Sequence, residues 1–176
     1  IGLAIAKRAG RDGANVVLLA KTDQPHPKLE GTIHTAAAEV EAAGGQALPI
    51  VTDIRQPAEV QAAVEKAVER FGGTDILVNN ASAIRLTCTA ETSVKRYDLM
   101  HEVNGRGTYA CAYACLPYLK KAQNPHILTL SPPLNLRPEW CWPYPAYAVT
   151  KYTMSLFAMA WAEEFRAFGI ASNALW

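Results

Sequence analysis

Short apolar runs alternate along the chain with longer amphipathic stretches, and this alternation predicts the fold. The apolar runs lie at residues 15–20, 46–52, 75–79, 126–131 and 170–175. Helical patterns lie at residues 1–12, 33–43, 57–71, 92–121 and 146–169. Continuous apolar runs are typical of parallel strands that are buried on both faces. We therefore predict an α/β fold with a doubly wound, Rossmann-like parallel sheet.

Turn and cap residues divide these elements. Thr32 is suited to cap the helix at 33–43, and Pro57 to stand in the first turn of the next helix. Prolines and a glycine at 21–31, Pro27 among them, indicate a loop there. Thr92 is a candidate cap for the long helix, and the glycines within 105–107 predict a kink in it.

Composition narrows the class of protein. The 176 residues are half hydrophobic and carry a net charge of +1, as expected of one soluble globular domain. We find no basic stripe that would favour nucleic acid or an anionic membrane. The longest apolar stretch, residues 154–162, is too short for a membrane span, and we see no signal peptide.

The four cysteines, Cys88, Cys111, Cys115 and Cys141, lack the spacing of a zinc site, and we expect no metal. Two of them, Cys111 and Cys115, fall on one face of a predicted helix. We predict free thiols in a reducing compartment. That compartment is the cytoplasm if the protein is bacterial, with the peroxisome or mitochondrion as the alternatives for a eukaryotic one.

Tyr147 and Lys151 carry the main candidate chemistry. They are four residues apart in a predicted helix and therefore lie on one face of it. A nearby cation favours the phenolate and lowers the pKa of a phenol, which is otherwise about 10. Such a pair suits general acid–base catalysis on a hydroxyl or a carbonyl. The alternative is an ordinary surface pair.

The predicted strands end in polar residues: Lys21, Asp53, Asn79-Asn80-Ala81 and Ser131. Ligands of doubly wound sheets bind at the carboxyl ends of the strands, so we expect these residues along one edge. Each has a structural alternative. Asp53 could cap the following helix, the asparagine pair could fasten the end of its strand, and Lys21 could be a solvated charge.

Four motifs together resemble the short-chain dehydrogenase/reductase family. They are Asp53-Ile54, Asn79-Asn80-Ala81-Ser82, Val103-Asn104-Gly105-Arg106-Gly107 and the pair Tyr147 and Lys151. The second differs from the family's signature by a serine where glycine is usual. The stretches 21–28, 127–136 and 173–176 resemble the hydroxysteroid dehydrogenase-like branch in particular. The resemblance covers the whole chain.

The resemblance implies hydride transfer between an NAD(P) nicotinamide and an alcohol or carbonyl. Tyr147 would then be the acid/base, and Lys151 would lower its pKa and bind the nicotinamide ribose. Asn104 would hold a water in a proton relay. The implied cofactor-binding residues are Gly2, Lys21, Asp53, Asn80, Ala81, Tyr147 and Lys151. Lys21 follows Ala20 at the place where an acidic residue would select NAD, so we predict NADP, with NAD as the alternative.

Two departures from the family pattern matter. The resemblance places Pro132 where the family's substrate-polarising serine stands, and proline has neither a hydroxyl nor an N–H. Ser131 is the nearest substitute. The chain also begins inside a helix, and Gly2 alone remains of the glycine-rich turn. We therefore expect residues 1–176 to be a single NAD(P)-binding domain truncated at both ends, lacking the first strand and a C-terminal part, and inactive by itself.

The leading hypothesis is an NADP-dependent oxidoreductase for an apolar, steroid-like or fatty substrate. The loop residues suited to such a substrate are Trp140, Trp142, Tyr144 and Pro145, and plain packing is the alternative for the aromatic ones. Because of Pro132, the alternative is a nucleotide-binding module with weak or no catalysis. A third reading, a structural dimer formed by the long helices, is compatible with both. We expect a homo-oligomer when the protein is full length.

Overall fold

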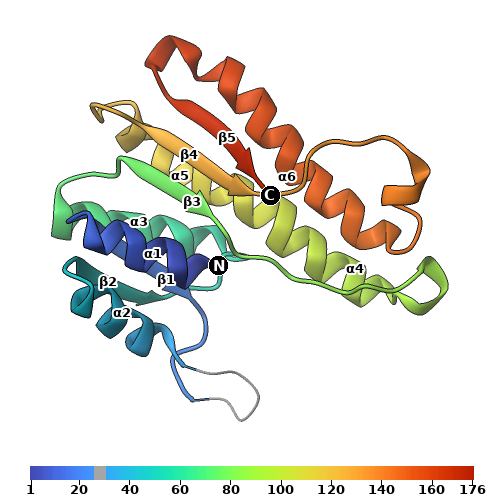
Figure 1. The fold of residues 1–176 in the computed structure, drawn as a ribbon, viewed down its shortest axis with the longest axis horizontal. Coiled ribbons are helices and arrows are strands. Elements are labelled where there is room, and N and C mark those ends of the chain that lie inside the picture. The colour runs from blue at the N-terminus through green and yellow to red at the C-terminus, as the bar shows by residue number, and fades with distance from the viewer. Residues whose placement is uncertain (26–30) are drawn as a thin grey trace. The chain divides into compact units, whose positions relative to one another are not determined.

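The computed structural model of the chain describes residues 1–25 and 31–176. Pro27 of the predicted loop, and the end of the stretch 21–28, lie outside the described residues. The chain divides into two compact units, residues 1–72 and 73–176 (Figure 1). Each unit consists of parallel strands with helices between them, as the sequence predicts.

The first unit is a two-stranded parallel sheet with three helices. In chain order its elements are α1 (Gly2–Arg11), β1 (Asn15–Ala20), α2 (Ile33–Ala42), β2 (Gln46–Val51) and α3 (Pro57–Phe71). The strands pair in register from Asn15 with Gln46 to Ala20 with Val51. Both strands therefore end at the same edge of this sheet.

Local chemistry explains the helix ends of this unit. The Thr32 hydroxyl accepts hydrogen bonds from the N–H groups of His34 and Thr35, and the Thr35 hydroxyl accepts one from the Thr32 N–H at 2.8 Å. This reciprocal cap confirms the predicted start of α2. Pro57 is the first residue of α3, where its missing N–H costs nothing, and Gly72 ends α3 with a φ of 86°.

The second unit is a three-stranded parallel sheet in the order β3 (Ile76–Asn79), β4 (His126–Leu130), β5 (Ala171–Leu175). Its helices are α4 (Val94–Met100), α5 (Thr108–Leu119) and α6 (Pro145–Glu164). Asn79 pairs with Thr129, and Leu130 with Leu175, so the three strands also end at a common edge. Within each unit, the predicted alignment of the strand ends is confirmed.

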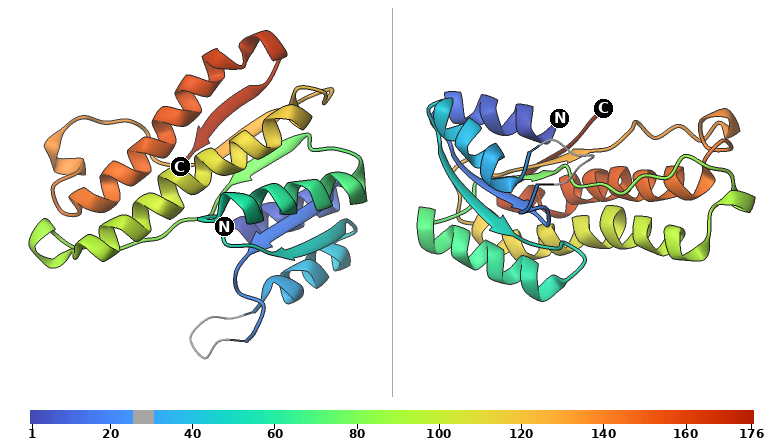
Figure 2. Two further views of the ribbon diagram at one scale, coloured as in Figure 1. Left: turned by 180° about the vertical axis from the view of Figure 1, so that it is seen from behind. Right: turned by 90° about the horizontal axis from the view of Figure 1, so that it is seen from below.

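The helices α5 and α6 cover one face of the second unit's sheet (Figure 2). Helix α5 contacts β3, and α6 contacts β4 and β5. Ile127, Thr129 and Ser131 point to this face and are buried, whereas the alternating Leu128 and Leu130 are only half-buried. The core of the unit lies between this face and the helices.

The prediction that the strands are buried on both faces is wrong for the described residues. Strand β4 alternates between buried and half-buried residues because α5 and α6 cover one face. The inner residues of β1 and β2 are half-buried, and their last residues, Ala20 and Val51, are exposed. Within the part of the chain that the structure describes, each of these two strands has one paired neighbour.

The predicted long helix is interrupted where the glycines weaken it. A π-helical turn, His101–Gly107, joins α4 to α5 and contains both Gly105 and Gly107. Thr92 does not cap this helix, because α4 begins after Ser93 and the Thr92 hydroxyl donates to the Cys88 carbonyl at 2.9 Å. The last predicted helix ends early, at Glu164, and the remaining residues form a short 3₁₀ turn.

Candidate active site

Helix α6 presents Tyr147 and Lys151 one turn apart near its beginning, as predicted. Pro145, in the first turn, suits the helix start because its φ is already helical. Lys151 Nζ donates to the carbonyl oxygen of Leu130, the last residue of β4, at 2.6 Å. Burial lowers the pKa of Lys151. The bond fastens the candidate catalytic pair to the end of the central strand of this unit.

Asn104 lies in the π-helical turn and is fully buried. Its Oδ1 accepts a hydrogen bond from the Ala83 N–H at 2.7 Å, and its Nδ2 donates to the Ala83 carbonyl and the Thr150 hydroxyl, both at 2.9 Å. The Thr150 hydroxyl donates to the Tyr147 carbonyl at 2.8 Å. The amide of Asn104 therefore joins the segment after β3 to the start of α6. Its proposed water-holding role stays a prediction.

The two neighbouring asparagines, Asn79 and Asn80, suit different roles, one structural and one in ligand binding. Asn79 is buried, and its Nδ2 donates to the Thr129 hydroxyl at 3.4 Å, which fastens β3 to β4. Asn80 and Ala81 are exposed at the end of the strand. The structural reading thus applies to Asn79, and the next two residues remain available to a ligand.

Ser131 is 3% exposed, and its hydroxyl has no hydrogen-bond partner among the described residues. Its side chain points to the face of β4 that α6 covers, together with Thr129. The carbonyl of Pro132 accepts a hydrogen bond from the Ser155 hydroxyl at 2.6 Å. The segment that should polarise a substrate oxygen therefore offers one buried hydroxyl and no N–H from Pro132.

The first unit carries the other predicted residues. Asp53 follows β2, and both of its oxygens accept from Arg55 Nε, at 2.9 and 3.0 Å. The hydrogen bond from Arg55, with a smaller contribution from the charge of Lys21, lowers the pKa of Asp53 to about 2. Gly2 is the first residue of α1, and Lys21 is exposed just after β1. Their cofactor-binding roles stay predictions.

Sequence reasoning missed three residues of α6. Thr150 connects Asn104 to the carbonyl of Tyr147, and Ser155 and Tyr152 donate to carbonyls of the loop after β4. The residue type alone gave no signal, because hydroxyl groups in a helix usually bond their own helix or water.

Metal ligands and thiols add little to the site. Among residues 1–25 and 31–176, no group of three or more metal-ligating side chains comes together. All four cysteines are free, and Cys111 and Cys115 lie four residues apart on α5, as predicted. Both are buried, which raises their pKa values to about 11 and about 12. None of the helices described combines the length and apolar character that a membrane crossing requires.

Known proteins support the family suggested by the motifs. The profile of the family described as short chain dehydrogenase matches residues 1–176. Hydroxysteroid dehydrogenase-like protein 2 of Homo sapiens is 59% identical over 176 residues, which are 100% of this chain and 42% of the human protein. The chain thus spans less than half the length of this relative.

Solved structures agree. The crystal structure of a short chain dehydrogenase from Mycobacterium thermoresistibile is 60% identical, with a TM-score of 0.97 over 99% of this chain and 62% of that one. A metagenomic short-chain oxidoreductase in complex with NADP is 25% identical, with a TM-score of 0.86 over 98% of this chain and 75% of that one. By motifs, fold and relatives together, the chain belongs to the short chain dehydrogenase family and resembles its hydroxysteroid dehydrogenase-like members.

Proposed function

We propose that the full-length protein is an NADP-dependent oxidoreductase that interconverts the alcohol and carbonyl forms of an apolar substrate. The observation that carries this proposal is the placement of Tyr147 and Lys151 on α6, with Lys151 half-buried and bonded to the end of β4. Residues 1–176 would belong to a single NAD(P)-binding domain.

The residues present fit a nicotinamide cofactor. Lys151 Nζ has three N–H groups and donates to the Leu130 carbonyl and the Met154 sulfur, so one remains for a ribose hydroxyl. Asn80 and Ala81 are exposed after β3, where ligands of such sheets bind. In the first unit, Lys21 supplies a cation for a 2′-phosphate, which favours NADP over NAD. A similar structure of 25% identity is in complex with NADP, and the choice of NADP for this protein rests on Lys21.

The residues of α6 would manage the proton. The bound cofactor supplies the hydride for reduction. Tyr147 gives its phenolic proton to the substrate oxygen, or accepts the proton of the alcohol in the reverse direction. The positive charge of Lys151 stabilises the phenolate that remains after reduction. We expect a water bonded at Asn104 to return the proton to Tyr147.

The loop between β4 and α6 favours an apolar substrate. Leu136 is 89% exposed, Trp140 64% and Trp142 70%. Exposed aromatic and aliphatic side chains so close in sequence to Tyr147 would contact a steroid-like or fatty molecule.

The four free thiols favour a reducing compartment, which in a bacterium is the cytoplasm.

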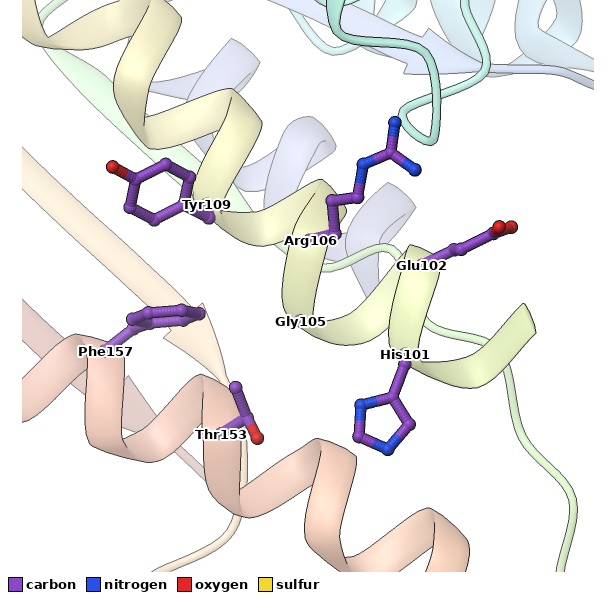
Figure 3. Close-up of a pocket in the computed structure, with 7 residues that line it drawn as sticks. All are labelled: His101, Glu102, Gly105, Arg106, Tyr109, Thr153 and Phe157. Atoms are coloured by element: carbon purple, nitrogen blue, oxygen red, sulfur yellow. The ribbon is translucent and has the colours of Figure 1, made fainter. Parts of the chain in front are cut away.

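We also propose that the full-length protein forms a homo-oligomer through α5 and α6. A cavity of about 390 Å³ lies between the π-helical turn, α5 and α6 (Figure 3). Tyr109 of α5 and Phe157 of α6 lie beside it with ring centroids 5.7 Å apart, and Tyr113 is exposed next to Tyr109. A second copy of the chain would cover this apolar surface. Light scattering on the full-length protein measures the expected dimer or tetramer, and a monomer would refute it.

The test of the oxidoreductase proposal is turnover by the full-length protein. It would be mixed with NADPH and a panel of apolar ketones and fatty aldehydes, and the nicotinamide absorbance followed. Loss of turnover in Tyr147→Phe, measured with NADPH at a concentration that saturates the variant, supports the proposal. Because Pro132 replaces a hydroxyl, the second candidate is a nucleotide-binding module. Tight NADPH binding without turnover on any substrate would favour that module.

A further inference from the structure

The end of β4 and the loop after it are fastened to α6 by three side chains of that helix. Lys151 donates to the Leu130 carbonyl, Ser155 to the Pro132 carbonyl and Tyr152 to the Asn135 carbonyl, at 2.6, 2.6 and 2.7 Å. Pro132 and the proline after it have no N–H, so this segment cannot continue a strand. The carbonyl groups of this segment are therefore the main-chain groups left to fix its path, and side chains of α6 donate hydrogen bonds to them.

The acceptors of these three hydrogen bonds are spread along residues 130–135. Lys151 and Ser155 hold the end of β4 and the second residue after it. Tyr152 reaches farther, to Asn135, and the thiol of Cys141 beside its phenol raises the pKa of Tyr152. A single phenolic oxygen thus contacts the loop at two places.

The exposed apolar residues of the loop lie between or beside those two places. Leu136 follows Asn135 directly, Trp140 precedes Cys141, and Trp142 follows it. Asn135 is further ordered because its Oδ1 accepts a hydrogen bond from the Arg137 N–H at 3.0 Å. The loop between the two contacts is therefore held as a short arch with its apolar side chains outward.

We propose that Tyr152 is a positioning residue that holds the loop 133–144 in the shape that binds the apolar part of the substrate. This proposal rests on the proposed function, because it assigns the loop to the substrate. Tyr152 would take no part in the chemistry, since Tyr147 and Lys151 perform it. Its contribution would be to substrate affinity and selectivity, with cofactor binding left unaltered.

The test uses Tyr152→Phe in the full-length protein, which removes one oxygen and keeps the ring. Tyr118→Phe is the matched control, since the Tyr118 hydroxyl makes no hydrogen bond among the described residues. We expect Tyr152→Phe to raise KM for apolar ketones about fivefold, the effect of one neutral hydrogen bond. We expect kcat, the dissociation constant of NADPH and the melting temperature to change little in both variants.

A second readout does not depend on turnover. Hydrogen exchange in residues 133–144, and alkylation of Cys141 by iodoacetamide resolved by mass spectrometry, report the loop directly. Cys88 is exposed and remote from Tyr152 in sequence, and serves as the internal reference. We expect both rates to rise several-fold in Tyr152→Phe and to stay at the unaltered values in Tyr118→Phe. A faster hydrogen exchange of residues 133–144 in Cys141→Ala as well would support the second contact.

The outcomes separate this proposal from the proposed function. Unchanged exchange and alkylation in Tyr152→Phe would overturn it, and so would a loosened loop with unchanged KM. If the unaltered protein shows no turnover, the proposed function fails. The dissociation constants of the same ketones, measured by quenching of tryptophan fluorescence, then replace KM and decide the role of Tyr152.

Discussion

The contact between Asn104 and Thr150 allows a quantitative test of how the site is assembled. Both residues are fully buried, and Asn104 Nδ2 donates to the Thr150 hydroxyl at 2.9 Å. Thr150→Val keeps the shape of the side chain, removes the acceptor and leaves one buried N–H of Asn104 without a partner. We expect the free energy of unfolding to fall by about 2 kcal/mol, since an unsatisfied buried donor costs roughly 1–3 kcal/mol.

Asn104→Ala removes more hydrogen bonds than Thr150→Val does. It deletes the bonds to both main-chain groups of Ala83 as well as the bond to Thr150. Ala83 is only half-buried, so water can replace part of what its two groups lose. We expect a loss of about 3 kcal/mol, near the upper range for breaking a buried network.

The double variant decides whether the two side chains act together. Once Thr150→Val has left the amide unsatisfied, removing that amide costs less, so the losses should fall short of additivity by about 1 kcal/mol or more. Urea unfolding of the full-length protein measures all four corners of the cycle, with Thr150→Ser as the control that keeps the hydroxyl. If the losses of the two single variants add up to that of the double variant within roughly 0.5 kcal/mol, the hydrogen bonds of Asn104 and Thr150 do not act together to connect Ala83 to α6.

Three further predictions concern the departures and charges noted above. Pro132→Ser should raise kcat of the full-length enzyme on ketones by about 10-fold or more, the effect of one hydrogen bond to a developing charge, and an unchanged kcat would show that the site needs no hydroxyl there. Lys21→Ala should weaken NADPH binding by about 10-fold and leave NADH binding unaltered, as titration of both would show. Because the pKa of Asp53 is lowered to about 2, its pairing with Arg55 should stabilise the fold above pH 3.8 and lose its effect as the pH falls toward 2. Unfolding of Asp53→Asn against the unaltered protein, measured from pH 6 to pH 2, should show a stability difference that disappears toward the acid end.

Hydrophobic periodicity and the proline and glycine residues at the ends of elements were enough to predict most of the fold. The strand at 15–20 and the helix at 57–71 have the predicted bounds, because a continuous apolar run and a proline-to-glycine segment leave few alternatives. The misjudged ends lie where tertiary contacts compete with local preference. Thr92 bonds the carbonyl of Cys88 instead of capping α4, and local sequence does not reveal that choice.

The site divides in the same way. The placement of Tyr147 and Lys151 on one helix face could be predicted because a helix dictates their spacing, and Asn104 was a candidate because it stands in a motif. Burial of the unpartnered Ser131 hydroxyl follows from the alternation of β4, but the α6 donors to the following loop could not be predicted. Those bonds depend on the path of a proline-rich loop, and no periodic pattern specifies such a path.

The most direct test of the proposed chemistry is the transfer of deuterium from C4-deuterated NADPH to an apolar ketone by the full-length protein. Mass spectrometry of the product alcohol, for the unaltered protein and Tyr147→Phe, gives the answer. We predict an alcohol that carries one deuterium, formed at a rate that falls by at least about 100-fold in Tyr147→Phe, as loss of a general acid requires. Saturated NADPH binding with no deuterium in any product would contradict the proposal that Tyr147 and Lys151 support hydride transfer.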